Sequence, residues 1–156
     1  MATHSKIKVN LTGVHLCCQG CVDAANNALM SVDGVDSSSD METRTATFTA
    51  VDVATAQKAL DALGTAGFYG SSDNPQVAMK PVSAIPQGKV HSLEVSGIHN
   101  CCGKCYKAIK DAIESVDGVS GTTAKPKVTT FEVTGNFSAV ALVKALNAAG
   151  FSARVK

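Results

Sequence analysis

Two short segments of this chain carry the same string of potential metal ligands, His-x-Cys-Cys-x-x-Cys, 84 residues apart. The residues of the two copies are His15, Cys17, Cys18 and Cys21, then His99, Cys101, Cys102 and Cys105. All six cysteines of the 156-residue chain lie in these two motifs. Each motif holds three thiols, an odd number that disulfides within one motif cannot close. We therefore expect metal or redox chemistry in a reducing compartment instead of a disulfide framework.

Three ligand arrangements are compatible with the two motifs. Two or three thiolates of one motif could hold Cu(I), a combination that ligand softness favours. The three cysteines and the histidine of one motif could hold Zn(II), but adjacent cysteines usually point to different sides. The two motifs could also face each other, within a chain or between chains, and share a 4Fe-4S cluster or a small Cu(I)-thiolate cluster. His15 and His99 are either ligands or groups that close the loop by bonding to backbone.

The motifs belong to two copies of a longer unit. Residues 13–35 align without gaps on residues 97–119, with 12 of 23 positions identical, and the later Ala-Gly-Phe at 66–68 aligns on residues 149–151. Each copy reads β-α-β-β-α-β, with alternating strands and apolar stripes at helical spacing. Two helices on one face of an antiparallel sheet make a ferredoxin-like sandwich. The sequence predicts an α+β fold of two tandem sandwiches.

The expected domains are residues 1–73 and 89–156, joined by a linker at 74–88 that contains three prolines. In the second domain we predict a strand over residues 127–133 and a helix N-cap at Ser138. The two domains differ in charge: the first has four Lys and Arg against eight Asp and Glu, and the second has nine against five. This asymmetry either reflects drift after duplication, or lets the two halves attract each other or oppositely charged partners.

Each motif runs into the first helix of its unit, and the helix N-terminus lowers thiol pKa values and stabilises metal thiolates. Lys104 and Lys107 add positive charge beside the second motif, whereas Gln19 and Asp23 accompany the first. We therefore predict that the second motif holds an anionic thiolate complex better than the first.

A strand, a glycine, a short loop, Cys-x-x-Cys, a helix, Asp-Gly-Val and a terminal Gly-Phe together resemble the heavy-metal-associated domain of copper chaperones and metal-transporting P-type ATPases. The resemblance implies a soft ion, most often Cu(I), that is passed to another such domain or to an ATPase by ligand exchange. The ligands it implies are Cys18 and Cys21, and Cys102 and Cys105. It also places Phe68 and Phe151 next to the metal loops.

Both copies depart from that family in the same way. Their loops are two residues longer, and Val14 and Ile98 stand where a loop-packing methionine is expected. Cys17 and Cys101 are additional thiols, accompanied by the histidines. We therefore predict a thiophilic metal-binding protein for trafficking, buffering or detoxification, with all six cysteines as candidate ligands and with domain pairing or homodimerisation as a route to a shared site.

Several other classes of function find little support in the sequence. The net charge of +1 gives no reason to expect nucleic acid, and no apolar run is long enough to span a membrane. The N-terminal residues have no signal-peptide pattern, which favours a cytoplasmic location, or a periplasmic or exported one if a leader has been removed. A dithiol oxidoreductase is an alternative use of Cys-x-x-Cys, but no catalytic constellation accompanies the motif, so we expect a protein that is not an enzyme.

Overall fold

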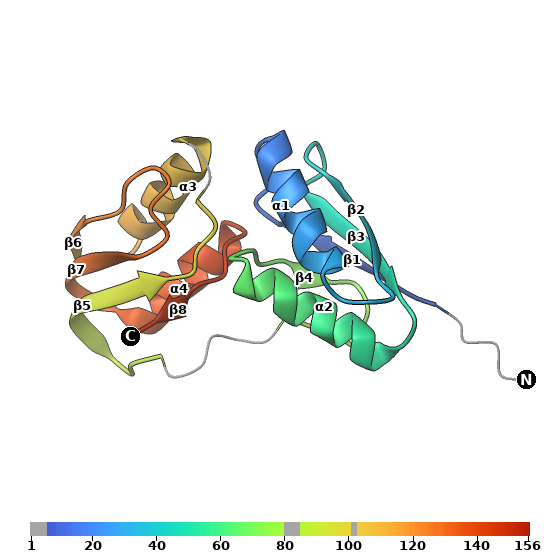
Figure 1. The fold of residues 1–156 in the computed structure, drawn as a ribbon. Coiled ribbons are helices and arrows are strands. Elements are labelled where there is room, and N and C mark those ends of the chain that lie inside the picture. The colour runs from blue at the N-terminus through green and yellow to red at the C-terminus, as the bar shows by residue number, and fades with distance from the viewer. Residues whose placement is uncertain (1–5, 80–84, 101–102) are drawn as a thin grey trace, which may run out of the picture.

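The computed structural model describes residues 6–79, 85–100 and 103–156. Within these ranges the chain forms two four-stranded antiparallel sheets, each accompanied by two helices (Figure 1). The α+β architecture of two ferredoxin-like units is the one that the repeated sequence predicts. Figure 1 shows the first helices of the two units, α1 and α3, on the same side of the molecule.

The first unit buries the apolar stripes of its two helices against one sheet, whose strand order is β2-β3-β1-β4. Its elements are β1 (Ile7–Thr12), α1 (Gln19–Met30), β2 (Asp36–Asp40), β3 (Thr45–Ala50), α2 (Val53–Thr65) and β4 (Ser71–Ser72). Strand β3 alternates threonine with buried Ala46, Phe48 and Ala50, the pattern of a strand with one face in the core. Asp52 caps α2 by accepting a hydrogen bond from the Thr55 amide at 2.7 Å.

The second unit repeats this topology with strand order β6-β7-β5-β8. Its elements are β5 (Lys89–Ser96), α3 (Gly103–Glu114), β6 (Val119–Thr122), β7 (Phe131–Ser138), α4 (Ala139–Ala148) and β8 (Arg154–Val155). The predicted N-cap is confirmed, because the Ser138 hydroxyl accepts a hydrogen bond from the Ala141 amide at 3.2 Å.

The strand predicted over residues 127–133 is placed wrongly. Lys127 has a φ of +67° and lies in a turn, and the strand begins at Phe131 and continues to Ser138. The Thr- and Val-rich composition pointed to the right region. It missed the turn because lysine, unlike glycine, gives no signal of a left-handed backbone.

The first part of the expected linker packs against the first unit. Val77 and Met79 are buried, with 3% and 8% of their surfaces exposed. The Gln57 side chain on α2 donates a hydrogen bond to the Ala78 carbonyl at 2.9 Å and accepts one from its amide at 3.4 Å. The chain leaving the first unit is therefore held on α2 as far as residue 79.

Candidate metal site

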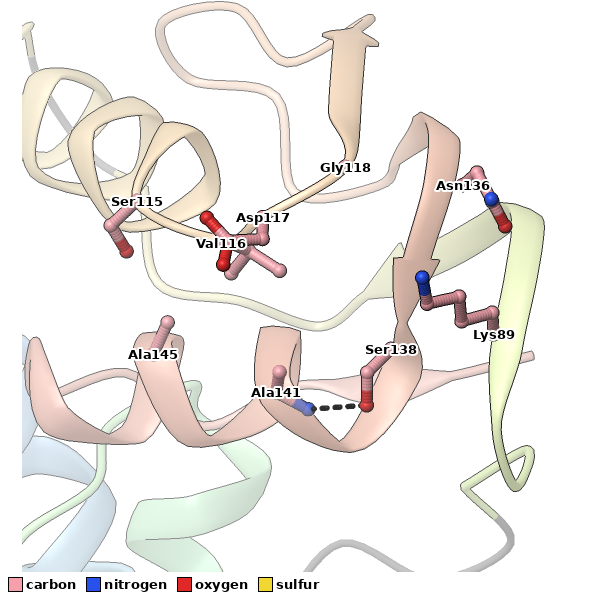
Figure 2. A pocket seen from close by; sticks show the side chains of 9 residues that line it. All are labelled: Lys89, Ser115, Val116, Asp117, Gly118, Asn136, Ser138, Ala141 and Ala145. Carbon is pink, nitrogen blue, oxygen red and sulfur yellow. Dashed lines mark hydrogen bonds between the residues drawn. The ribbon is translucent and has the colours of Figure 1, made fainter.

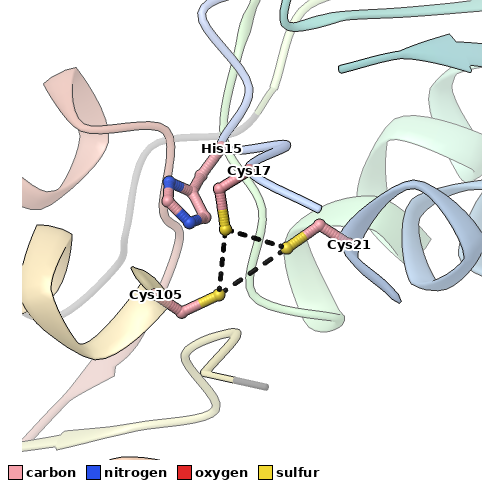
Figure 3. A group of neighbouring side chains, drawn as sticks. All are labelled: His15, Cys17, Cys21 and Cys105. Carbon is pink, nitrogen blue, oxygen red and sulfur yellow. Dashed lines mark hydrogen bonds between the residues drawn. The ribbon is translucent and has the colours of Figure 1, made fainter. Parts of the chain in front are cut away.

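The two Cys-rich loops come together between the halves of the molecule. Figure 3 shows Cys17 and Cys21 of the first motif facing Cys105 of the second. The three sulfur atoms form a triangle: Cys17 Sγ lies 3.6 Å from Cys21 Sγ and 3.8 Å from Cys105 Sγ, and the latter two are 3.6 Å apart. These separations are far longer than the roughly 2 Å of a disulfide bond. The three sulfurs therefore meet as non-bonded neighbours.

This triangle has the dimensions of a site for one metal ion. The point equidistant from the three sulfurs lies about 2.1 Å from each, close to the metal-thiolate bond length of about 2.3 Å. A four-iron cluster would need its thiolates on different irons and hence spread farther apart.

His15 offers the fourth donor. One ring nitrogen of His15 and the three sulfurs all lie within 4.8 Å of one another (Figure 3). The residue is only 7% exposed, and its Nε2 atom is buried without a hydrogen-bond partner among the described residues. Burial lowers the pKa of His15, so the ring is neutral at pH 7 and presents a lone pair. An unpaired buried nitrogen is costly, and a bound ion would remove that cost.

Two more donors lie beside the sulfur of Cys21. Cys18 Sγ is 3.6 Å away, and His99 Nε2, from the second half, is 3.3 Å away. Cys18 is half-buried, whereas Cys21 and His99 are buried. Cys21 Sγ thus contacts side chains from both loops.

The start of α1 favours negative charge at these thiols. Cys18 occupies the N-cap position, and its side chain makes no capping hydrogen bond. The first turns of both α1 and α3 contain no acidic residue, so the positive end of each helix dipole faces the cysteines. Hydrogen bonds from Cys105, and then from His99, lower the pKa of the Cys21 thiol against the opposing effect of burial. The Cys21 thiol is therefore prepared to bind metal as a thiolate.

Two glycine carbonyls hold the loops together across the halves. The carbonyl of Gly67 accepts hydrogen bonds from the amides of Ser152 at 2.9 Å and His99 at 3.4 Å. The carbonyl of Gly150 accepts the equivalent bonds from Tyr69 at 2.9 Å and His15 at 3.3 Å. Gly67 and Gly150 occupy equivalent positions in the two sequence repeats, so the contacts are reciprocal. The halves thus pair as an isologous dimer would.

Reciprocal ring contacts complete this pairing. The ring of Phe68 stacks on His99 with centroids 4.2 Å apart, and the ring of Phe151 lies 4.3 Å from that of His15. Both phenylalanines are fully buried, and they form an isolated antiparallel bridge with each other. Each half therefore orients the histidine of the other.

Residues 92–152 match the sequence model of the heavy-metal-associated domain. The solution structure of the N-terminal soluble domains of Bacillus subtilis CopA is a similar solved structure, with 16% sequence identity, coverage of 99% of this chain and 97% of that chain, and a TM-score of 0.36. No curated protein sequence matches the chain.

The match to the heavy-metal-associated domain at residues 92–152 supports heavy-metal binding. Its matched segment contains His99 and Cys105, which contact the first-half thiol Cys21. The four helices of the described residues have 10 to 13 residues, and none could cross a membrane.

The structure brings most of the predicted site residues together. Those placed at or beside the cluster are His15, Cys17, Cys18, Cys21, Phe68, His99, Cys105 and Phe151. Lys104 and Lys107 are exposed near the start of α3, on either side of Cys105. Cys101 and Cys102 lie outside the described residues, so their role as ligands stays a prediction.

Two glycines and one asparagine with structural roles at the site were not anticipated from the sequence. Gly67 and Gly150 have φ angles of +96° and +93°, and a Cβ atom there would come within 2.1 Å of the His99 amide nitrogen and 2.3 Å of that of His15. Their presence in both repeats, before a phenylalanine, was the available signal. Asn100 is buried, and its amide donates hydrogen bonds of 2.8 Å to the carbonyls of Lys125 and Val128. It ties the loop after β5 to the β6–β7 turn.

A separate hollow of about 540 Å³ lies in the second half, between the start of α4 and the turn after α3 (Figure 2). Its lining side chains are small or polar, and include Lys89, Asp117 and Asn136 but neither cysteine nor histidine. Soft-metal ligands are therefore concentrated at the junction of the halves and are absent from the lining of this hollow.

Proposed function

We propose that this protein binds a thiophilic heavy-metal ion, with Cu(I) as the first candidate, at a single site that its two halves build together. The observation that carries the proposal is the sulfur triangle of Cys17, Cys21 and Cys105, which has the size of one metal-thiolate centre. The neutral, buried His15 supplies a fourth donor. Thiolates with imidazole suit Cu(I), a soft ion.

The biological role that suits such a site is trafficking, buffering or detoxification of the ion. The heavy-metal-associated domain at residues 92–152 supports this class of role. The metal is then cargo, received from and released to a partner such as another domain of this kind or a metal-transporting ATPase. A shared buried site favours retention, because the ion must lose a ligand from one half before it leaves.

Zn(II) is the second candidate, supported by the S₃N donor set of three cysteines and one histidine. Three thiolates and one imidazole are a ligand set of many structural zinc sites. Metal analysis of protein purified anaerobically distinguishes the candidates: copper or zinc near one per chain supports a shared mononuclear site, whereas iron with acid-labile sulfide supports the cluster alternative.

The test of a shared site is a double-mutant cycle in Cu(I) affinity, measured anaerobically against a competing chelator. We expect Cys17→Ser and Cys105→Ser each to weaken binding 10- to 100-fold. The loss of binding free energy in the double variant should be much smaller than the sum of the two single losses, because the two residues serve the same ion. His15→Ala tests the fourth ligand, and His91→Ala is its control because His91 is exposed on β5.

Independent sites predict a different result. If each half bound its own ion, Cys17→Ser would affect only one of two ions, Cys105→Ser would affect only the other, and the two effects would add. That outcome, with circular dichroism showing intact folding of each variant, would contradict the shared site. Failure of the wild-type chain to bind any thiophilic ion tightly would remove the proposed function altogether.

A further inference from the structure

The two histidines of the repeated motif make different contacts with the sulfur cluster. The ligand atom of His15 belongs to a group with those of Cys17, Cys21 and Cys105, all within 4.8 Å of one another. His99 is not a member of that group. Its Nε2 atom instead lies 3.3 Å from Cys21 Sγ, and the residue is buried, with 9% of its surface exposed. Equivalent residues of the two repeats are therefore placed for different roles.

We propose that His99 is a positioning residue: its Nε2–H donates a hydrogen bond to the Cys21 thiolate while that sulfur binds the ion, and His99 itself does not bind the ion. The proposal rests on the proposed function, because it assigns a role beside the ion described there. The donor belongs to the second half of the chain and the acceptor to the first.

The chemistry of the two groups sets the direction of this hydrogen bond. A thiolate has lone pairs and no proton, so it can only accept. A neutral imidazole carries its proton on one nitrogen, and the nitrogen that faces a thiolate must be the protonated one. In this tautomer Nε2 of His99 has no lone pair to offer a metal ion. Sulfur is a larger atom than oxygen, so a separation of 3.3 Å between nitrogen and sulfur is a hydrogen-bond distance.

The hydrogen bond stabilises the charge of the bound state. Three thiolates around one Cu(I) carry an excess of negative charge, and Cys21 and Cys105 are both buried. Burying charge is costly unless hydrogen bonds or opposite charges compensate it. A hydrogen bond to an ionised acceptor is stronger than one between neutral groups. The N–H of His99 therefore lowers the cost of keeping Cys21 as a thiolate beside two others.

The first half of the chain orients His99 for this bond. The His99 ring stacks on Phe68 with centroids 4.2 Å apart and an interplanar angle of 27°. The His99 amide donates to the Gly67 carbonyl at 3.4 Å. Both contacts come from the half that also carries Cys21. A ring held in this way needs little further ordering to form the hydrogen bond.

This arrangement links metal release to separation of the halves. Cys105, a ligand, and His99, the donor to Cys21, both belong to the second half. When the halves separate, the ion loses one ligand and Cys21 loses its hydrogen bond in the same movement. The sulfur that stays on the first half then holds the ion more weakly.

The first experiment measures the anaerobic Cu(I) affinity of the full chain against a competing chelator. His99→Phe keeps an aromatic ring on Phe68 but removes the donor, and it should weaken binding about tenfold. His99→Gln places an N–H the same number of bonds from Cβ as Nε2 of histidine, so it should recover most of the affinity. His99→Asn is one bond shorter and should not. His91→Phe, at an exposed position on β5, is the control and should leave the affinity unchanged.

Rescue by glutamine separates a hydrogen-bond donor from a residue that only packs. A packing role predicts that His99→Phe binds like wild type, or that His99→Gln loses as much affinity as His99→Phe. Either result, with circular dichroism showing intact folding, overturns the proposal.

X-ray absorption of the Cu(I)-loaded chain separates a donor from a ligand. We expect one imidazole per copper in the wild type and in His99→Phe, and none in His15→Ala. Loss of the imidazole signal in His99→Phe would make His99 a ligand and overturn the proposal. Nitrogen-15 NMR should show a proton on Nε2 of His99 in the loaded chain, and an unprotonated Nε2 also overturns it.

The two levels of inference fail in different ways. If the wild-type chain binds no thiophilic ion tightly, the proposed function fails. If the wild type binds Cu(I) tightly and His99→Phe binds it equally well, the proposed function stands and only the role of His99 is wrong.

Discussion

Gly67 and Gly150 provide a way to separate the two halves without touching a metal ligand. A Cβ atom at Gly150 would lie 2.3 Å from the His15 amide nitrogen, and one at Gly67 would lie 2.1 Å from that of His99. Cβ atoms essentially never approach other atoms closer than 3.0 Å, so Gly67→Ala requires the loop of the other half to retreat by about 0.9 Å. The colliding atoms belong to the backbone of the other half, so no side-chain rotation can relieve the collision.

A loop displacement of about 0.9 Å is large compared with the bond lengths of a metal site. Cys105 Sγ is 3.6 Å from Cys21 Sγ, and a metal-thiolate bond is about 2.3 Å. Moving one loop by nearly 1 Å stretches the bond from Cys105 toward 3 Å, at which it no longer contributes. We expect Gly67→Ala and Gly150→Ala each to weaken metal binding 10- to 100-fold, or about 1.4–2.7 kcal/mol.

The chain contains a matched control for backbone strain. Gly88 has a φ of +75°, and an added Cβ there would meet no atom within 4 Å. Gly88→Ala therefore introduces the strain of a left-handed alanine, about 1 kcal/mol or more, without a collision between the halves. Cu(I) affinity by chelator competition and thermal unfolding should be measured on all three variants. Only the variants at Gly67 and Gly150 should lose affinity.

If Gly67→Ala and Gly150→Ala remain folded and bind metal within twofold of wild type, contact between the halves does not determine the affinity. The site would then be local to one motif, and the sulfur triangle would be incidental.

Other predictions concern stability and the termini of the units. Asp52→Ala removes the side-chain cap of α2 and should lower the free energy of unfolding by about 1 kcal/mol, as measured by urea denaturation. Gln57→Ala removes both hydrogen bonds to Ala78, so amide exchange at residues 77–79 should accelerate while exchange in β1 and β3 is unchanged. The backbone amide of Asn10 and its side-chain amide each donate a hydrogen bond to the Asp73 carboxylate. These bonds, the backbone one most strongly, lower the pKa of that carboxyl. A carboxyl with a lowered folded-state pKa contributes stability above its unfolded pKa of about 3.9 and loses it as pH falls through the folded value. An NMR titration should therefore give Asp73 a pKa below 3.9, and Asn10→Ala should return it toward that value.

Much of the fold follows directly from the residues. The repeat, the positions of the helices and the Ser138 cap are encoded locally, because apolar spacing and capping depend on neighbours in the sequence. The strand predicted at 127–133 failed for a local reason too, since Lys127 adopts a left-handed conformation without a glycine. The concentration of every thiol in two loops was likewise sufficient to predict soft-metal chemistry.

The order of residues along the chain specifies which side chains are available as ligands, but not which of them meet. Cys105 joins Cys17 and Cys21, and His99 reaches Cys21, because two reciprocal Gly-Phe corners fix one half against the other. The sulfur and imidazole contacts join residues 78 to 88 positions apart, and their geometry depends on how the two folded units pack against each other. The joining of the two motifs into one cluster is therefore a property of the folded chain.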